Sequence, residues 1–220
     1  MKRTDKFVQF AVAASAMAMQ DAGLPEITDQ AEQERFGVII GSGVGGMQTP
    51  ETQHSRYLKS GPGRISPLYV PMMISDMAAG YVSIHFKAKG PNFCTVSACA
   101  SSGHAVAMAF RSIKHGESDM MLTGGCEASV TPMGLGGFCS IKALSTRNDS
   151  PETASRPFDK ERDGFVLADG AGILMLEEYE HAKARGAKIY AEIVGYGATS
   201  DGFDMVAPSG EGAERAMRMA

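Results

Sequence analysis

Cys99 is the residue of this chain whose surroundings most favour chemistry. A short β-prone run over residues 93–97 ends at small residues just before it, and an alanine- and methionine-rich stretch typical of a helix begins just after it. The first turn of a helix offers backbone N–H groups without helical acceptors and the positive end of the helix dipole, so a thiol held there is biased toward the nucleophilic thiolate. The same N–H groups can hold a developing oxyanion. The pattern predicts a cysteine nucleophile on a strand-to-helix elbow.

A buried structural cysteine is the alternative for Cys99, because free cysteines are commonly core residues. The small residues on both sides favour the nucleophile, since they let a substrate approach the sulfur. The other cysteines are Cys94, Cys126 and Cys139, and the sequence contains no C-x-x-C pair. It therefore suggests neither a zinc site nor a disulfide framework, and we expect no metal and no cofactor. A reducing cytoplasm fits this cysteine usage best.

Helical and strand patterns alternate along the chain and would position this elbow. We expect strands at 36–40, 93–97, 120–123, 171–177 and 189–199. We expect helices at 7–22, 51–59, 71–86, from the elbow to 115, at 178–185 and from 212 onward. A polar stretch at 147–163, interrupted by Pro151 and Pro157, indicates a surface loop. The alternation predicts an α/β layered fold with parallel or mixed strand pairing.

Length, charge and hydropathy limit the class of protein. A chain of 220 residues is long enough for one sizeable core. A net charge of -4 argues against a nucleic-acid partner, whose phosphates need a basic face, and favours small-molecule or protein partners. No apolar run approaches the roughly 18 residues of a membrane span, and the N-terminus lacks the apolar core of a signal peptide. The sequence predicts a soluble, cytoplasmic protein.

Several separated motifs resemble those of a known family. They are Gly41-Ser42-Gly43-Val44-Gly45-Gly46, Ser97-Ala98-Cys99-Ala100-Ser101-Ser102, Gly136-Gly137-Phe138, Ala143-Leu144-Ser145-Thr146 and Asp159-Lys160-Glu161-Arg162-Asp163-Gly164-Phe165-Val166. In this order the motifs resemble those of the β-ketoacyl-acyl carrier protein synthases, most closely the elongating type II enzymes of bacterial fatty-acid synthesis. The resemblance extends over essentially all 220 residues.

The resemblance implies a fold, a reaction and partners. Members of the family have the thiolase-like fold, a layered α-β-α-β-α architecture in two similar α/β halves, and work as homodimers. They transfer an acyl chain from acyl carrier protein to the cysteine, here Cys99. They then condense it with the carbanion formed by decarboxylation of the malonyl thioester of the same carrier. A thiolate suits this role because it is a soft nucleophile and a good leaving group, and its own N–H would contribute to the oxyanion hole.

The condensing groups of the family are two histidines and a lysine of its second half. No histidine of this chain matches them, and each is expected on the surface or on a helix face: His54, His85, His104, His115 and His181. The family also opens with a central β-strand that has no counterpart here. We therefore expect residues 1–220 to be the N-terminal region of a synthase and the start of its second half, without the first strand and most of the C-terminal half. Such a chain would carry the nucleophile, would not condense by itself and would expose apolar sheet edges.

The resemblance also assigns secondary sites. Val44 and Tyr69 match positions that help shape the acyl-chain pocket, and Phe138 lies in the Gly-Gly-Phe motif near the cysteine. Ordinary core packing is the alternative for all three. The positions that receive the acidic carrier protein in relatives are matched or approached by Lys2, Arg3, Arg64 and Lys142. For each of these four, a solvated surface charge is the alternative.

Two other functions remain open. The glycines at 41, 43 and 46 have the spacing of a weak dinucleotide fingerprint, which keeps a nucleotide-binding α/β enzyme as an alternative. The loop lacks the G-x-x-x-x-G-K-[ST] pattern, however, and no acidic residue ends a second strand about 20 residues later. A non-catalytic dimerisation or interaction unit of the same fold is the other alternative, because the condensing groups are unmatched. Thiol labelling at Cys99 separates this unit from an acyltransferase.

Overall fold

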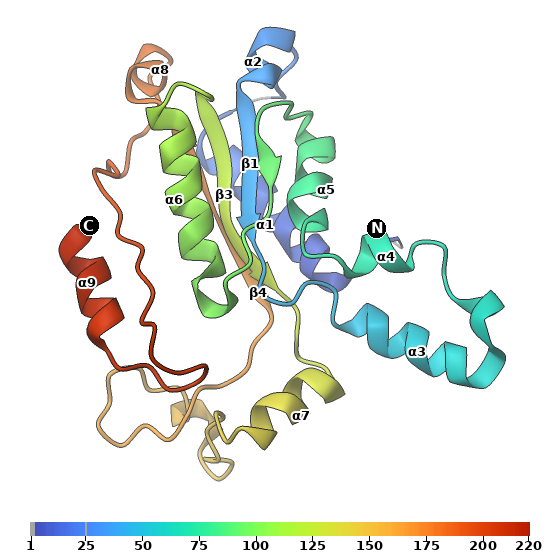
Figure 1. The fold of residues 1–220 in the computed structure, drawn as a ribbon. Coiled ribbons are helices and arrows are strands. Elements are labelled where there is room, and N and C mark those ends of the chain that lie inside the picture. The colour runs from blue at the N-terminus through green and yellow to red at the C-terminus, as the bar shows by residue number, and fades with distance from the viewer. Residues whose placement is uncertain (1–2, 25) are drawn as a thin grey trace.

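A four-stranded mixed sheet forms the centre of the computed structural model, which describes residues 3–24 and 26–220. Its strands are β1 Phe36–Gly41, β2 Asn92–Phe93, β3 Met120–Glu127 and β4 Gly170–Glu177, in the order β2-β1-β3-β4. β1 is parallel to both of its neighbours, and β4 runs antiparallel to β3 (Figure 1). The predicted α/β class with parallel or mixed pairing is confirmed.

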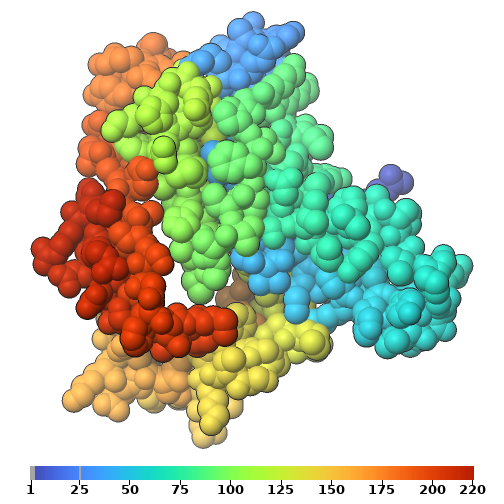
Figure 2. All heavy atoms as spheres, viewed as in Figure 1, coloured from blue at the N-terminus to red at the C-terminus, as the bar shows by residue number. Residues whose placement is uncertain are grey.

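Helices cover the sheet and extend beyond it (Figure 1). The longer helices are α1 Lys6–Asp21, α3 Gln48–Ser60, α5 Met77–Phe86, α6 Ser101–Lys114, α7 Pro132–Ser140 and α9 Glu211–Met219. The shorter ones are α2 Gln30–Glu34, α4 Tyr69–Met73, α8 Tyr179–Ala184 and the 3-10 turns η1 Pro62–Arg64, η2 Ala98–Ala100 and η3 Pro151–Thr153. α3, η1 and α4 form an arm that projects from the body of the molecule (Figure 2).

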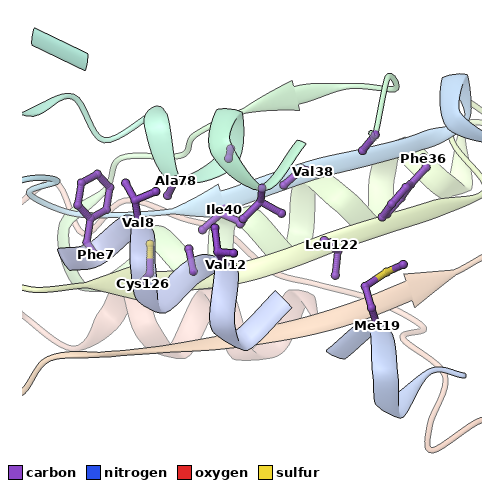
Figure 3. Close-up of a cluster of buried hydrophobic side chains, with 14 of the residues drawn as sticks. Phe7, Val8, Val12, Met19, Phe36, Val38, Ile40, Ala78, Leu122 and Cys126 are labelled. Atoms are coloured by element: carbon purple, nitrogen blue, oxygen red, sulfur yellow. The ribbon is translucent and has the colours of Figure 1, made fainter. Parts of the chain in front are cut away.

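The main hydrophobic core lies between the sheet and helices α1 and α5. Phe7 and Val12 of α1 pack with Ile40 of β1 in this cluster (Figure 3). The next residue, Ile39, belongs to a second cluster on the opposite face, together with Ala109 of α6. Because helices cover both faces, β1 is buried at every position, as is typical of parallel strands in layered folds. The described residues thus build three layers, helix, sheet and helix, around one sheet.

The sheet has no gap at its centre. β1 and β3 pair directly, from Phe36 opposite Met120 to Gly41 opposite Gly125. Each strand therefore provides the hydrogen-bond partners that the facing edge of the other needs, and no open edge is left between them. The sheet's outer strands are β2 and β4.

Most predicted elements are confirmed, but the predicted helix over 71–86 is wrong. Two helices, α4 and α5, occupy this region. The carbonyl of Met73 accepts a hydrogen bond from the N–H of Gly46 at 2.9 Å, and Ile74 is extended, with φ -69° and ψ 137°. The glycine loop after β1 thus docks on the chain where a single helix would have continued.

Three strand predictions are also corrected. The strand predicted over 93–97 is limited to β2, because β1 pairs with it only at Asn92 and Phe93. β3 continues past Thr123 through two glycines, since β4 pairs with them. Residues 189–199 form no strand, because no described strand lies beside them to complete a hydrogen-bond ladder. Two helices, α2 and α7, were not anticipated at all.

A charged cluster after β4 gives the fold a predictable pH dependence. The carboxylate of Glu177 accepts hydrogen bonds from Arg185 Nε at 2.7 Å, Arg185 Nη2 at 2.6 Å and His181 Nδ1 at 2.5 Å. Burial alone would raise the pKa of Glu177, but the hydrogen bonds from Arg185 and His181 outweigh it and hold the pKa below the ordinary 4.5. A carboxyl whose pKa is lowered by folding stabilises the protein above its ordinary pKa, and that stability is lost as pH falls through the folded-state pKa.

Glu177→Gln is therefore expected to cost about 2 kcal/mol of unfolding free energy at neutral pH, where the carboxylate accepts charged donors. The cost should shrink below about pH 4, because the native carboxyl is then being protonated as well. Urea unfolding of both proteins at several pH values measures this. An equal difference between them at every pH would contradict the account.

Candidate active site

The candidate functional groups gather beyond the carboxyl ends of the parallel strands. The glycine loop 41–46 follows β1, Cys99 follows β2, and Glu127 is the last residue of β3. In open α/β sheets, ligands bind at this edge. Figure 1 shows the start of α6 at this end of the sheet, on the side toward α7.

The elbow before Cys99 is held in a strained conformation. Ala98 has φ 49°, in the left-handed region, which costs a residue with a side chain about 1 kcal/mol. The buried hydroxyl of Ser101 spans the bend, because its Oγ accepts from the N–H of Ser97 at 2.9 Å and donates to the carbonyl of Ala98 at 2.7 Å. Thr95 Oγ1 donates to the carbonyl of Ser101 at 2.7 Å. These bonds set the direction in which the chain leaves the sheet.

Cys99 itself is exposed and lies in η2, immediately before α6. α6 is 14 residues long, so the backbone N–H groups and the positive dipole end of a full helix lie next to the sulfur. The predicted strand-to-helix elbow is thus present. A substrate carbonyl can reach this thiol from solvent, which a buried structural cysteine would not allow.

The other three cysteines occupy less favourable places. Cys126 is buried in β3, and burial, with a smaller contribution from Glu127, raises the pKa of its thiol strongly. Cys94 is half-buried, and burial raises its pKa as well. Cys139 is exposed, but it lies in the last turn of α7, where the backbone groups without helical partners are carbonyls, which cannot donate to an anion.

Cys99 is therefore expected to be the thiol that reacts first in the folded protein. Brief treatment with substoichiometric iodoacetamide, followed by peptide mapping, should place most of the label on Cys99, because Cys99 is exposed at a helix start, whereas burial raises the pKa of the thiols of Cys94 and Cys126. Preferential labelling of Cys94, Cys126 or Cys139 would contradict the assignment.

The glycine loop is already occupied by a carboxylate of the chain. Glu127 Oε2 accepts hydrogen bonds from the N–H groups of Gly43 at 2.8 Å and Val44 at 3.1 Å, and Oε1 accepts from Ser42 Oγ at 3.1 Å. A phosphate cradled by this loop would need the same N–H groups and would be repelled by the carboxylate. The geometry argues against the nucleotide-binding alternative.

Close approach of β1 to α6 also depends on a glycine. A Cβ built on Gly41 would lie 2.4 Å from both the carbonyl carbon and the oxygen of Ser101. Those are backbone atoms in the first turn of α6, so they can move only if the start of the helix moves. Gly41 thus permits the elbow to lie against the end of β1.

His104 lies on a face of α6, as expected, but its contact with the elbow was not anticipated. Its Nδ1 lies 2.6 Å from Ser97 Oγ, two residues before the thiol, and the ring is half-buried. Sequence reasoning also missed Ser101, Thr95 and Glu127. The serine could have been found from the run of small hydroxyl residues after the cysteine, whereas nothing local marks Glu127, which lies 84 positions from Gly43.

The three predicted pocket residues lie on different segments of the chain. Val44 is 48% exposed and follows Gly43, whose Cβ position lies 3.4 Å from the carbonyl oxygen of Ala98. Tyr69 begins α4 and is half-buried. Phe138 of α7 is half-buried and packs edge-on against Phe165, with 5.1 Å between ring centroids. Val44 lies next to the glycine that approaches the elbow, and the pocket roles of all three residues stay predictions.

The predicted basic residues that the structure describes are on the surface. Arg3, Arg64 and Lys142 are exposed, and Lys2 lies outside the described residues. Arg64 lines a polar cavity of about 510 Å³ together with Arg56, on the arm formed by α3, η1 and α4. The exposed side chains of Arg3, Arg64 and Lys142 are accessible to an acidic partner.

A second cavity, of about 680 Å³, lies away from Cys99, between α1, α6, β4 and residues 187–194. Its lining includes none of the predicted site residues, so we do not assign the chemistry to it. In the part of the chain that the structure describes, no group of three or more His, Cys, Asp or Glu side chains is arranged to hold a metal ion. Across the same residues, no helix combines the length and apolarity needed to cross a membrane.

The fold and the elbow together define the class of this protein. It is an α/β protein with an exposed thiol at the start of a helix, beyond the carboxyl ends of parallel strands. Residues 1–182 match the model of the family described as "Beta-ketoacyl synthase, N-terminal domain". The chain belongs to the β-ketoacyl synthase family, whose fold is thiolase-like.

Curated relatives agree with this membership. The chain is 49% identical over 218 residues to 3-oxoacyl-[acyl-carrier-protein] synthase 2 of Vibrio cholerae, and this match covers 99% of the chain and 52% of the relative. It is 52% identical over 221 residues to the protein of the same name from Staphylococcus aureus, a match that covers 100% of the chain and 53% of the relative. The chain thus spans about half the length of the curated relatives it matches.

Solved structures resemble the whole chain as well. A β-ketoacyl synthase from Burkholderia phymatum superimposes with a TM-score of 0.89 at 39% identity, covering 100% of this chain and 53% of the other. A ketosynthase structure described as a type II PKS acyl-carrier protein in complex with its ketosynthase gives a TM-score of 0.85 at 36% identity, covering 98% of this chain and 54% of the other.

Proposed function

We propose that Cys99 accepts an acyl chain from acyl carrier protein in fatty-acid elongation. The observation that carries the proposal is the exposed thiol on the strained Ala98 elbow at the start of α6. The names of the curated relatives, 3-oxoacyl-[acyl-carrier-protein] synthase 2, support the substrate class. Residues 1–220 would supply the nucleophile of a β-ketoacyl-acyl carrier protein synthase.

In this reaction the sulfur of Cys99 attacks the carbonyl carbon of the acyl thioester. The carbon–sulfur bond to the carrier then breaks, and the carrier's thiol leaves with the proton that Cys99 has given up. Backbone N–H groups at the helix start would stabilise the oxyanion of the tetrahedral intermediate. The products are an acyl-enzyme thioester and free carrier, which splits a difficult condensation into two easier steps.

Condensation with malonyl-acyl carrier protein would follow in the complete enzyme. Decarboxylation of the malonyl group develops negative charge, which needs positioned donors and acid–base groups. The histidines of this chain do not match the family's condensing residues, and His104 is engaged with Ser97. We infer that the 220 residues perform the acyl-transfer half of the reaction.

The partners follow from the same assignment. Arg3, Arg64 and Lys142 would receive the acidic carrier protein, as would Lys2. The complex of a carrier with its ketosynthase among the related structures supports such docking.

A homodimer would form along β2, which is an outer strand of the sheet. We also propose that the protein works in the cytoplasm. Sedimentation equilibrium tests the dimer, and a monomer at all concentrations would contradict it.

Val44→Trp is expected to shorten the acyl chain that the protein accepts, because the larger side chain beside the elbow would occupy space that a long acyl chain needs. Acylation by long-chain acyl carrier proteins should slow by about tenfold, with little change for short chains. Rates of Cys99 acylation across a series of chain lengths measure the effect. Equal slowing at every length would mean that Val44 only contributes to packing.

A test of the proposed function uses acyl carrier protein charged with a medium-length acyl group. Incubation with the purified protein should convert one carrier molecule per protein molecule to its free-thiol form while Cys99 loses its own thiol, so the measurement is the loss of the acyl mass from the separated carrier. A non-catalytic interaction unit of the same fold would bind the carrier without releasing its thiol, so an absence of release would reject acyl transfer in favour of that alternative.

A further inference from the structure

Glu127 holds the glycine loop through three hydrogen bonds to neutral donors. Besides the bonds from Ser42, Gly43 and Val44, the loop is closed by Ser42 Oγ, which accepts from the N–H of Gly45 at 3.1 Å. A charged acceptor makes stronger and shorter hydrogen bonds to such donors than a neutral one does. Glu127 therefore fixes the loop from 42 to 44 more firmly than backbone bonds alone.

The same carboxylate places the loop against the nucleophile elbow. A Cβ on Gly43 would lie 3.0 Å from Glu127 Oε2 and 3.4 Å from the carbonyl oxygen of Ala98, so Gly43 is sandwiched between the two. The N–H of Ser42 also donates to the carbonyl of Thr95 at 3.3 Å. A shift of the Glu127 carboxylate would thus move the loop relative to the residue that precedes Cys99.

The charge of Glu127 has no cationic partner among the ion pairs of the described residues, although Lys6, Arg35 and Arg185 pair with other carboxylates. The three hydrogen-bond partners of Glu127 all belong to the segment that carries Val44. This pattern favours a role in positioning that segment.

We propose that Glu127 is a positioning residue that sets the place of Val44 relative to Cys99 and thereby determines which acyl-chain lengths the thiol accepts. The proposal deepens the proposed acyl transfer and rests on it. Glu127 does not touch the reacting atoms. It acts through the loop that it holds.

The test compares Glu127→Ala and Glu127→Gln with the unmodified protein. Alanine removes all three hydrogen bonds, whereas glutamine keeps one acceptor oxygen for the loop amides. Glu177→Gln is the matched control, because Glu177 also accepts three hydrogen bonds at a sheet end but belongs to a cluster with His181 and Arg185. It should lower stability without touching the loop.

Two selectivity ratios are measured on each folded protein. The first is the rate of Cys99 alkylation by an iodoacetamide with a decyl chain relative to iodoacetamide itself, which needs no carrier protein. The second is the rate of Cys99 acylation by long-chain relative to short-chain acyl carrier protein. Glu127→Ala should change both ratios by about tenfold, since displacements near 1 Å have effects of this size or larger, and Glu127→Gln should change them less. Glu177→Gln should leave both ratios unchanged.

An unchanged ratio in either assay for folded Glu127→Ala overturns the proposal, as does an equal change in Glu177→Gln. If the alanine variant does not fold, Glu127→Gln decides, and ratios equal to those of the unmodified protein reject the proposal. If the unmodified protein is not acylated at all, the proposed function fails. The alkylation ratio then decides by itself whether Glu127 positions the loop.

Discussion

Cys99→Ala is expected to abolish acyl transfer from acyl carrier protein. The thiol is the group that we assign to the acyl-enzyme bond, and removal of a nucleophile typically lowers rates by about 10³-fold or more. The fold should be unaffected, because the side chain is exposed and its loss leaves no cavity. Release of free carrier thiol, measured with equal amounts of each folded protein, should fall to the uncatalysed level.

Cys139→Ala is the matched control for this experiment, since Cys139 is also an exposed thiol on a helix but lies at the opposite helix end. It should release carrier thiol at the unmodified rate. Release that survives in Cys99→Ala and disappears in Cys139→Ala would move the nucleophile to α7 and refute the elbow assignment.

Gly41→Ala is expected to destabilise the fold strongly. The new Cβ would lie 2.4 Å from backbone atoms of Ser101, so either β1 or the start of α6 must move. Overpacking of this kind costs about 3 kcal/mol. For a chain of 220 residues this corresponds to a fall in Tm of roughly 6–12 °C. Because the displaced atoms follow the elbow, alkylation of Cys99 should slow as well.

Gly103→Ala is the matched control, because Gly103 lies in α6, the helix whose first turn Gly41 approaches. No atom lies within 4 Å of the Cβ that would be added at Gly103. Alanine is favoured over glycine inside helices by up to about 1 kcal/mol, so this variant should have an equal or higher Tm. Equal losses of Tm in the two variants would mean that contact between Gly41 and Ser101 does not limit packing at the elbow.

Local sequence patterns predicted the elbow at Cys99. They could not predict the parts of the site that depend on contacts between residues far apart in the sequence. The small residues around Cys99 and the apolar helix after it are neighbours in sequence, and a helix start was expected where η2 and α6 begin. Glu127 could not be assigned from sequence, because the loop that it binds lies 83 to 85 positions away. Its role becomes visible only when β1 and β3 lie side by side.

The errors in the fold have the same physical origin. The helical pattern over 71–86 is locally sound, but the N–H of Gly46 takes the carbonyl of Met73 and the helix is interrupted. The pattern over 189–199 fits a strand, yet a strand needs a partner, and none of the described strands lies beside it. The direct pairing of β1 with β3 is likewise a contact between distant segments, so the sequence of either strand alone does not predict it.

The central claim, that Cys99 carries the acyl chain, is tested most directly by mass spectrometry of the protein after incubation with an acyl thioester of acyl carrier protein. The account predicts that the protein gains the mass of one acyl group, that hydroxylamine removes it, and that fragmentation places it on the sulfur of Cys99. An acyl group on another residue, or an unmodified protein in the presence of intact acyl carrier protein, would contradict the account.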